Sequence, residues 1–331
     1  MGCSNGEINR DMMRNAPPGA SKILSIGECM VEMARGSDSR FTLAVGGDTF
    51  NTAVYMARLG ADVGYVTALG DDPYSDEIAA TADSEGVDTA AITRVAGRMP
   101  GLYLIETDGG ERSFWYWRDH APARDLFELP DAETTIARLE RADWIYFSGI
   151  TLSLYSPAAL DVFAAALTAA KAAGATVVMD SNYRPRGWRG DTERARATFQ
   201  RFWSLADIAL PTFDDEQDLW GEDRPAATIA RLSGLGVGEI CIKHGSDGAT
   251  IWAEDTGTVA VACPEQLSPL DTTAAGDSFN AAYVCARIAG AAPDAAAVAG
   301  HRLAAIVISH RGALAPNDAT DGYELIPSLA D

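Results

Sequence analysis

Short runs of consecutive apolar residues alternate with longer stretches of helical periodicity over most of the chain. The runs predict buried strands at residues 23–27, 63–70, 144–149, 176–180, 208–210 and 239–243. Apolar residues at helical spacing predict helices at residues 53–59, 76–85, 157–173, 192–205, 226–235, 279–289 and 294–310. Continuous apolar strands between helices are typical of a mostly parallel sheet covered on both faces. We therefore expect an α/β fold.

Other segments alternate polar and apolar residues, as half-exposed strands do. One covers residues 29–45, and a hairpin joins residues 102–107 to 112–118 through Asp108-Gly109-Gly110. We expect these strands, from about 28–45 and 100–118, to form a small lid. An aromatic ladder between the two strands would explain most of the rings in the hairpin, but it does not explain why the hairpin ends in Arg118. Residues 249–252 and 259–261 predict a further hairpin.

The chain is long enough for one large α/β domain, which we place at residues 21–318 of the 331. The polar segment 1–20 contains Pro17-Pro18-Gly19 and is expected to be a disordered leader. Residues 319–331 are expected to form a C-terminal tail.

Charge narrows the classes of partner. The formal net charge is −21 and the sequence pI is about 4.5, which argues against nucleic acid and anionic membranes, because phosphate backbones are held mainly by Lys and Arg. An anionic small molecule would need local cationic side chains, helix termini or Mg²⁺.

Cysteine and histidine give no sign of a zinc site. The five cysteines are far apart, and the four histidines form no H-E-x-x-H pattern. This cysteine usage indicates a reducing compartment, and no apolar run is long enough to span a bilayer, so we expect a cytoplasmic protein.

One stretch near the C-terminus carries the clearest sign of chemistry. Ala274, Ala275 and Gly276 put almost no side chain in front of a helix that is predicted from its apolar face at residues 279–286. A helix start offers unpaired N–H groups and the positive end of the helix dipole, so it suits a phosphate. Asp277 places a carboxylate beside that anion site. We therefore predict phosphoryl transfer, with Asp277 as the base.

Three more polar motifs follow predicted strands: Gly46-Gly47-Asp48, residues 180–184 and residues 243–248. Each has an ordinary interpretation; the first, for instance, is a strand-to-helix turn with Asp48 or Thr49 as N-cap. Together and in this order, the four motifs resemble the ribokinase-like (PfkB) family of carbohydrate kinases, from about Ile23 to about Pro316. The resemblance implies a ribokinase-like three-layer sandwich with a small strand lid.

The resemblance also implies roles. Asp277 would take the proton of a terminal C6 hydroxyl as it attacks the γ-phosphorus of ATP, and the N–H groups of residues 274–277 would neutralise the developing charge. Predicted sugar contacts are Gly46, Gly47, Asp48, Asn51, Tyr103, Tyr116, Arg118 and Arg184. Predicted nucleotide contacts are Asn182, Arg184, Lys243, Gly245, Ser246, Gly248, Ala274 and Gly276.

Two arginines bear on the choice of sugar. Arg118 and Arg184 each offer a bidentate fork for a carboxylate, which a neutral sugar would not require; the alternative for each is an ion pair with an acidic residue of this chain. Within the family, the hairpin and the motifs most resemble kinases of 2-keto-3-deoxy acid sugars. Fructose or 5-dehydro-2-deoxygluconate are alternative substrates. A sugar-binding regulator without catalysis would lack the base, and a dinucleotide-binding dehydrogenase would need a G-x-G-x-x-G after the first strand, which is absent.

Metal binding and assembly follow less directly from the resemblance. Relatives carry an Asn-x-x-Glu segment that organises Mg²⁺ waters; here Phe213 stands in place of the Asn and Glu216 is retained, so we predict a water-mediated role for Glu216. Relatives often have Gly where this chain has Ala274, and they bind a monovalent cation near the position of Asp271. Exposed lid strands tend to pair, so we expect a homodimer or a higher homo-oligomer.

Overall fold

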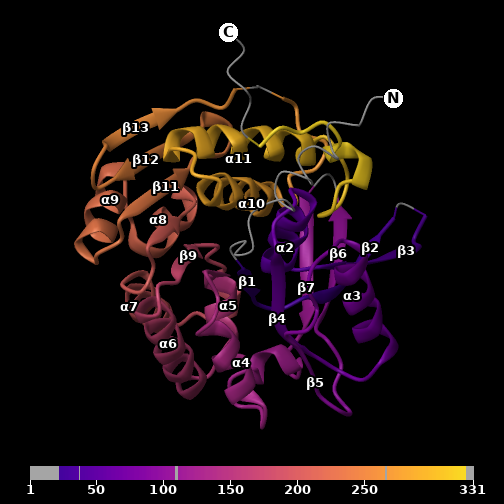
Figure 1. Cartoon of the computed structure of the whole chain (residues 1–331). Helices are drawn as coiled ribbons and strands as arrows, with labels where there is room; N and C mark the ends of the chain where they lie inside the picture. Colours follow the sequence, from indigo (N-terminus) through magenta and orange to yellow (C-terminus); the bar gives the residue numbers. More distant parts are fainter. Residues whose placement is uncertain (1–21, 37, 109–110, 265–266, 326–331) are drawn as a thin grey trace, which may run out of the picture.

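The structure is a computed structural model, and it describes residues 22–36, 38–108, 111–264 and 267–325. The predicted leader lies outside the described residues, as do residues 326–331 of the predicted tail. Figure 1 shows a body of strands between two groups of helices, with a separate small sheet beside it.

The described residues of the body form one sheet of nine strands in the order β13-β12-β11-β10-β9-β8-β1-β4-β5. Neighbouring strands are parallel from β11 to β5, while β12 and β13 are antiparallel additions at one edge. The strands are β1 (Ile23–Ile26), β4 (Val63–Leu69), β5 (Ile92–Arg94), β8 (Trp144–Ser148), β9 (Thr176–Asp180), β10 (Ile208–Leu210), β11 (Glu239–Lys243), β12 (Ala249–Ala253) and β13 (Gly257–Val261).

Helices cover both faces of this sheet, and each face has its own apolar core. One face carries α4 (Ala132–Leu139), α5 (Gly149–Leu154), α6 (Pro157–Ala172), α7 (Thr192–Trp203), α8 (Phe213–Trp220) and α9 (Pro225–Gly234). The other carries α2 (Asp48–Arg58), α3 (Pro73–Ser84), α10 (Ala275–Ile288) and α11 (Pro293–Ile308). Fully buried rings such as Phe163 and Trp203 fill the first core, and Phe50 and Tyr283 fill the second. The predicted three-layer α/β sandwich is confirmed.

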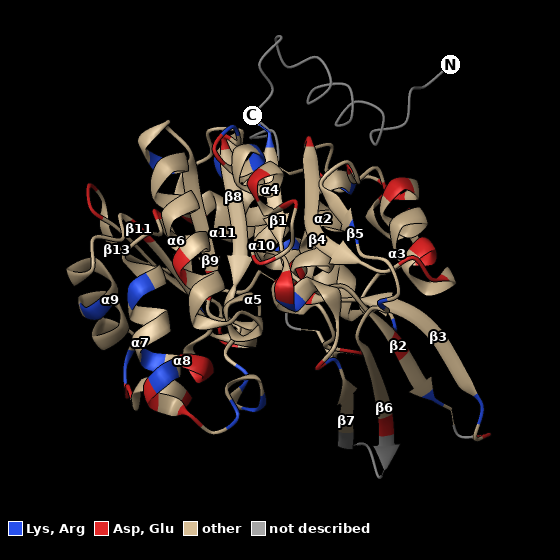
Figure 2. Ribbon diagram, turned by 90° about the horizontal axis from the view of Figure 1, so that it is seen from below, with Lys and Arg blue, Asp and Glu red and all other residues tan. Residues whose placement is uncertain are grey.

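The predicted lid is a four-stranded sheet in the order β3-β2-β6-β7, which extends away from the body in Figure 2. Its strands are β2 (Met30–Arg35), β3 (Phe41–Gly46), β6 (Leu102–Asp108) and β7 (Glu111–Trp117). Successive side chains of a strand point to opposite faces. One face packs Met30, Tyr103 and Ile105 together, and the other exposes Trp115 and Trp117.

Some elements were not predicted. The short helices α5 and α8 and the strand β5 have too few apolar positions for a clear period, whereas α4 carries Ala132, Ile136 and Leu139 at helical spacing and was overlooked. Helix α10 begins at Ala275, four residues before the predicted start, so Asp277 lies inside its first turn. In the described part of the chain, no helix is long and apolar enough to cross a membrane.

Candidate active site

Two helix starts meet at the carboxyl ends of the parallel strands, where ligands of such sheets bind. They belong to α2 and α10, which pack against each other. The Asn51 amide of α2 donates a 2.8 Å hydrogen bond to Asp277 Oδ2 of α10. The amide oxygen of Asn51 is buried and has no hydrogen-bond partner among the described residues, so it remains available to a ligand. Two predicted site residues, 226 positions apart, are thus in direct contact.

Asp277 has the electrostatics of a group that can hold and release a proton. Burial, together with the negative charges of Asp48 and Asp180, raises the pKa of Asp277 to about 8. The hydrogen bond from Asn51 and the positive charge of Lys243 act in the opposite direction. A carboxyl tuned close to neutral pH is suited to general base catalysis.

The turn before Asp277 leaves backbone donors free. Ala275 N–H donates to Thr272 O at 3.2 Å, so this predicted donor already has a partner. Among the described residues, the N–H groups of Ala274, Gly276 and Asp277 have no hydrogen-bond acceptor. They remain available for an anion at the positive end of the helix.

Ala274 itself adopts a left-handed backbone conformation, with φ 59° and ψ 16°. This conformation costs an L-residue roughly 1–2 kcal/mol and favours glycine. An alanine at this position therefore has a conformational cost that a glycine would not have.

Asp48 does not cap its helix. The N-cap residue of α2 is Gly47 and no side chain caps this end, so the alternative interpretation of Asp48 or Thr49 as N-cap is wrong. Instead, Asp48 Oδ2 accepts hydrogen bonds from Ser148 Oγ at 2.5 Å and from Asn182 Nδ2 at 2.8 Å. Asn182, which was predicted to contact the nucleotide, therefore donates to a carboxylate that was predicted to contact the sugar. Burial raises the pKa of Asp48.

The glycines before α2 are required by the lid. A β-carbon at Gly47 would lie 2.1 Å from the Glu28 carbonyl oxygen, and one at Gly46 would lie 2.9 Å from the Tyr103 hydroxyl. That hydroxyl donates a short hydrogen bond to Glu32. Close packing at the base of the lid therefore explains the glycine pair without a sugar.

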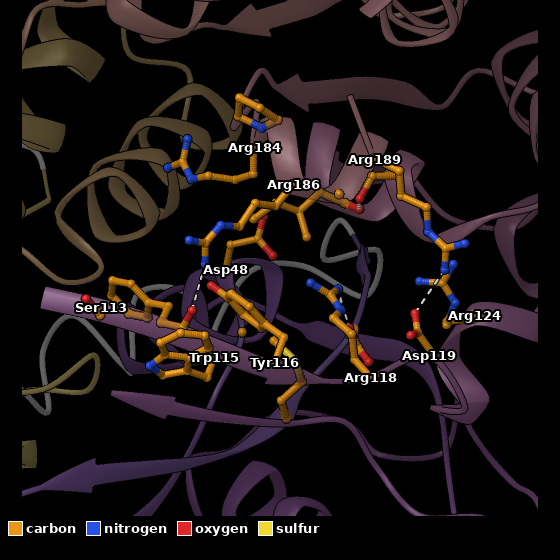
Figure 3. A pocket seen from close by; sticks show the side chains of 18 residues that line it. Asp48, Ser113, Trp115, Tyr116, Arg118, Asp119, Arg124, Arg184, Arg186 and Arg189 are labelled. Atoms are coloured by element: carbon orange, nitrogen blue, oxygen red, sulfur yellow. Dashed lines mark hydrogen bonds and ion pairs between the residues drawn. The ribbon is translucent and has the colours of Figure 1, made fainter. Parts of the chain in front are cut away.

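A cavity of about 950 Å³ opens between the lid and the body (Figure 3). Its described lining includes Asp48 and Tyr116, which were predicted to touch the sugar. It also contains five arginines against three carboxylates, in a chain whose net charge is −21. The arginines are Arg118, Arg124, Arg184, Arg186 and Arg189, and the acids are Glu28, Asp48 and Asp119. This local excess of positive charge suits an anionic ligand.

Both predicted arginines already pair with protein carboxylates. Arg118 forms an ion pair with the buried Glu28, and Arg184 Nη1 lies 3.0 Å from Asp215 Oδ1. Ion pairing, the alternative considered above, therefore applies to each. Either guanidinium has five N–H donors, more than these contacts use, so a second carboxylate can still bind.

Arg124 was missed. It is half-buried in the short 3₁₀ helix η1 (Pro122–Asp125), and its side chain makes no ion pair or hydrogen bond within the described residues. Desolvation lowers the pKa of Arg124. Its position six residues after Arg118 was the available signal, but the sequence did not indicate that it would face the same cavity.

The predicted nucleotide residues near β11 have structural partners. Lys243 is buried, and its Nζ donates to Asp180 Oδ1 and to Asn280 Oδ1, at 3.0 and 2.9 Å. Gly245 and Ser246 lie in the 3₁₀ turn η3 (Gly245–Asp247). Gly248 has φ 99°, and a β-carbon there would lie 2.2 Å from the Val261 carbonyl oxygen, so strand packing already requires glycine.

Glu216, which was predicted to act on a metal through water, has a partner within the protein. Its side chain is buried in α8 and forms an ion pair with Arg231 of α9, which also pairs with Glu222 at 2.7 Å. Burial raises the pKa of Glu216 to about 8. Among the described residues, no group of three or more His, Cys, Asp or Glu side chains is placed to hold a metal ion.

The chain is similar to known sugar kinases over most of its length. Residues 20–320 match the pfkB family of carbohydrate kinases. A 2-dehydro-3-deoxygluconokinase of Dickeya dadantii is 42% identical, with 90% of this chain and 97% of that protein covered.

Solved structures share the ribokinase-like fold. A PfkB protein of Polaromonas sp. JS666 superposes with a TM-score of 0.78 at 24% identity, covering 88% of this chain and 96% of that one. A fructokinase of Xylella fastidiosa with bound ATP gives 0.77 at 23% identity, covering 91% and 95%. The chain belongs to the pfkB family of carbohydrate kinases.

Proposed function

We propose that this kinase transfers the γ-phosphoryl group of ATP to O6 of 2-dehydro-3-deoxy-D-gluconate. The observation that carries the acid sugar is the cavity with five arginines and three carboxylates. The relative named for this reaction, 42% identical, supports the same substrate. Fructose is the contrasting alternative, because a neutral sugar would leave the cavity arginines without a carboxylate to bind.

Asp277 is the proposed base. As O6 forms its bond to the γ-phosphorus, Asp277 takes the O6 proton, and the bond from the γ-phosphorus to the bridging oxygen breaks with its electrons left on ADP. The unpaired N–H groups of Ala274, Gly276 and Asp277 would neutralise charge on the transferred group. Mg²⁺ bound to the ATP phosphates would offset part of their negative charge. A monovalent cation near Asp271 stays a prediction.

The substrate carboxylate is the group that the cavity selects. We propose that Arg118 and Arg124 both bind this carboxylate. Arg124 lacks a protein partner in the described structure. A hydrogen bond to a charged group contributes about 1.5–3 kcal/mol, or a factor of about 10 to 150.

Arginine variants test this selection. Arg124→Ala and Arg118→Ala should each lower kcat/KM for the acid sugar about 10–150-fold and change kcat/KM for fructose less than about threefold. Arg201→Ala, which removes an exposed arginine paired with Asp161 outside the cavity, is the matched control. Equal losses on both sugars would refute carboxylate recognition by these side chains.

We also propose that the enzyme is a homodimer through the outer face of the lid. Leu43, Trp115 and Trp117 are 42, 54 and 62% exposed on the face of the lid opposite to Tyr103 and Tyr116, although Trp115 also borders the cavity. Such a contiguous apolar face on a sheet with open edges favours pairing with a second copy. Trp117→Glu should yield monomers in light scattering, whereas Val259→Glu, at the far edge of the large sheet, should not. A dimer that persists in Trp117→Glu would exclude this face.

A further inference from the structure

A buried polar network lies directly beneath the two helix starts of the site. Lys243 Nζ at the end of β11 binds Asp180 of β9 and Asn280 of α10. The Asn280 amide in turn donates to Asp180 Oδ2 at 2.9 Å and to the Tyr146 hydroxyl at 3.0 Å. Asn280 is one helical turn after Asp277, on the same side of α10.

The network also reaches the other helix. Thr52 Oγ1 donates to the Asp48 carbonyl oxygen at 2.9 Å and lies 3.4 Å from the Tyr146 hydroxyl, from which it can accept. Chains of hydrogen bonds therefore join β8, β9 and β11 to the first turns of α2 and α10, which carry Asn51 and Asp277. Such a satisfied buried network fixes the geometry of the groups above it.

Lys243 is buried and already hydrogen-bonded, which limits its ability to contact a ligand. It is only 6% exposed, and two of its three N–H donors are used. A β-carbon at Gly276 would lie 4.0 Å from Lys243 Nζ, which places the ammonium beneath the turn at residues 274–277. The sequence could not distinguish this position from a nucleotide contact.

We propose that Lys243 is a positioning residue: its ammonium holds Asp180 and Asn280 beneath the turn and supplies the positive charge that lets Asp277 ionise. This proposal rests on the proposed role of Asp277. The charged and titratable groups around Asp277 are Asp48 and Tyr55 of α2, Tyr146 of β8, Asp180 of β9 and Lys243 of β11. Within this set, Lys243 alone is cationic, and the negative charge of Asp180 opposes its effect on Asp277.

Two single variants should therefore move the pH profile in opposite directions. Lys243→Met should move the acid limb of kcat/KM to higher pH, and activity at pH 7 should fall about tenfold for each pH unit that the limb moves. Asp180→Asn should move the limb to lower pH. The double variant Asp180→Asn/Lys243→Met removes both charges and should return the limb close to the wild-type position. It also avoids an unpaired buried charge, so it remains informative if Lys243→Met does not fold.

The controls separate positioning from nucleotide contact. Lys171→Met breaks a more exposed pair with Asp207, at a similar distance of 2.9 Å on another part of the molecule, and should leave the profile unchanged. The ATP dissociation constant, measured by calorimetry, should change less than about threefold in the double variant. A large loss of ATP affinity in the double variant, or a limb that does not move in the two single variants, would overturn the proposal.

Absence of turnover in the wild-type protein would instead count against the proposed function. In that case the carboxyl ¹³C shift of Asp277 can be titrated directly. The proposal then requires the pKa of Asp277 to be highest in Lys243→Met and lowest in Asp180→Asn, and any other order contradicts it.

Discussion

The hydrogen bond from Asn51 to Asp277 offers a quantitative test of how the base is tuned. With a pKa of about 8, Asp277 is mostly protonated at pH 7 in the free enzyme. Asn51→Ala removes the 2.8 Å donor that stabilises the ionised form. A hydrogen bond to a charged group contributes about 1.5–3 kcal/mol and about 1.4 kcal/mol equals one pKa unit, so the pKa of Asp277 should rise by about one to two units.

The sign follows from the role of Asp277. A base must be ionised to accept a proton, so a higher pKa lowers activity below that pKa and leaves it unchanged well above. In a coupled assay for ADP, the kcat/KM of Asn51→Ala should be about 10–100-fold below wild type at pH 7, and the deficit should shrink as pH rises towards about 10. Lost contact with the sugar would lower kcat/KM by the same factor at every pH.

Asn182→Ala is the matched control, because it removes an amide donor at the same 2.8 Å distance from Asp48 rather than from Asp277. Loss of that donor favours the protonated form of Asp48 and thus weakens the negative charge that acts on Asp277. The acid limb of Asn182→Ala should therefore not move upward. An upward shift in both variants, or a pH-independent loss in Asn51→Ala, would refute the proposed tuning.

Three further predictions concern single side chains. Asp277→Asn should lower kcat by about 10²–10⁴ while the ATP dissociation constant from calorimetry stays within about threefold; substantial turnover would remove Asp277 from the base role. Ala274→Gly should raise the free energy of unfolding in urea by about 0.5–1 kcal/mol, because it relieves a residue at φ 59°, and a loss would contradict that conformation. Arg231→Met leaves Glu216 and Glu222 without their ion-pair partner, so in the same assay it should cost up to about 3–5 kcal/mol at a pH where both carboxylates are ionised, and less where Glu216 is protonated, without changing the Mg²⁺ concentration for half-maximal rate; a changed Mg²⁺ requirement would support the water-mediated metal role predicted for Glu216.

The fold could be predicted because its signals are local. The five-residue segment that became β9, with three apolar residues at its centre, was predicted from the sequence with the bounds found in the structure. The sequence also predicted that Asp277 stands at a helix start after small residues, because these features are adjacent in the chain, and their proposed roles as base and anion site remain predictions. The residues of this site are neighbours in the sequence, so no knowledge of the tertiary structure was needed to group them.

The partners of charged side chains could not be predicted in this way. Arg118 pairs with Glu28 and Lys243 with Asp180, at separations of 90 and 63 residues, and these pairings depend on which strands become neighbours. Arg124 lies in the cavity lining together with Arg118 (Figure 3), and this depends on the path of the chain after β7, which the sequence does not reveal. Residue type indicated a cationic site, but the three-dimensional arrangement decides which cations remain available.

The ratio of kcat/KM for 2-dehydro-3-deoxy-D-gluconate to that for D-fructose, measured with ATP and Mg²⁺ at pH 8, tests the central claim most directly. If the cavity binds a carboxylate through charge-assisted hydrogen bonds, the ratio should be at least about 10, and up to about 150 for each such bond. A ratio near one, or a preference for fructose, would contradict an acid-sugar kinase.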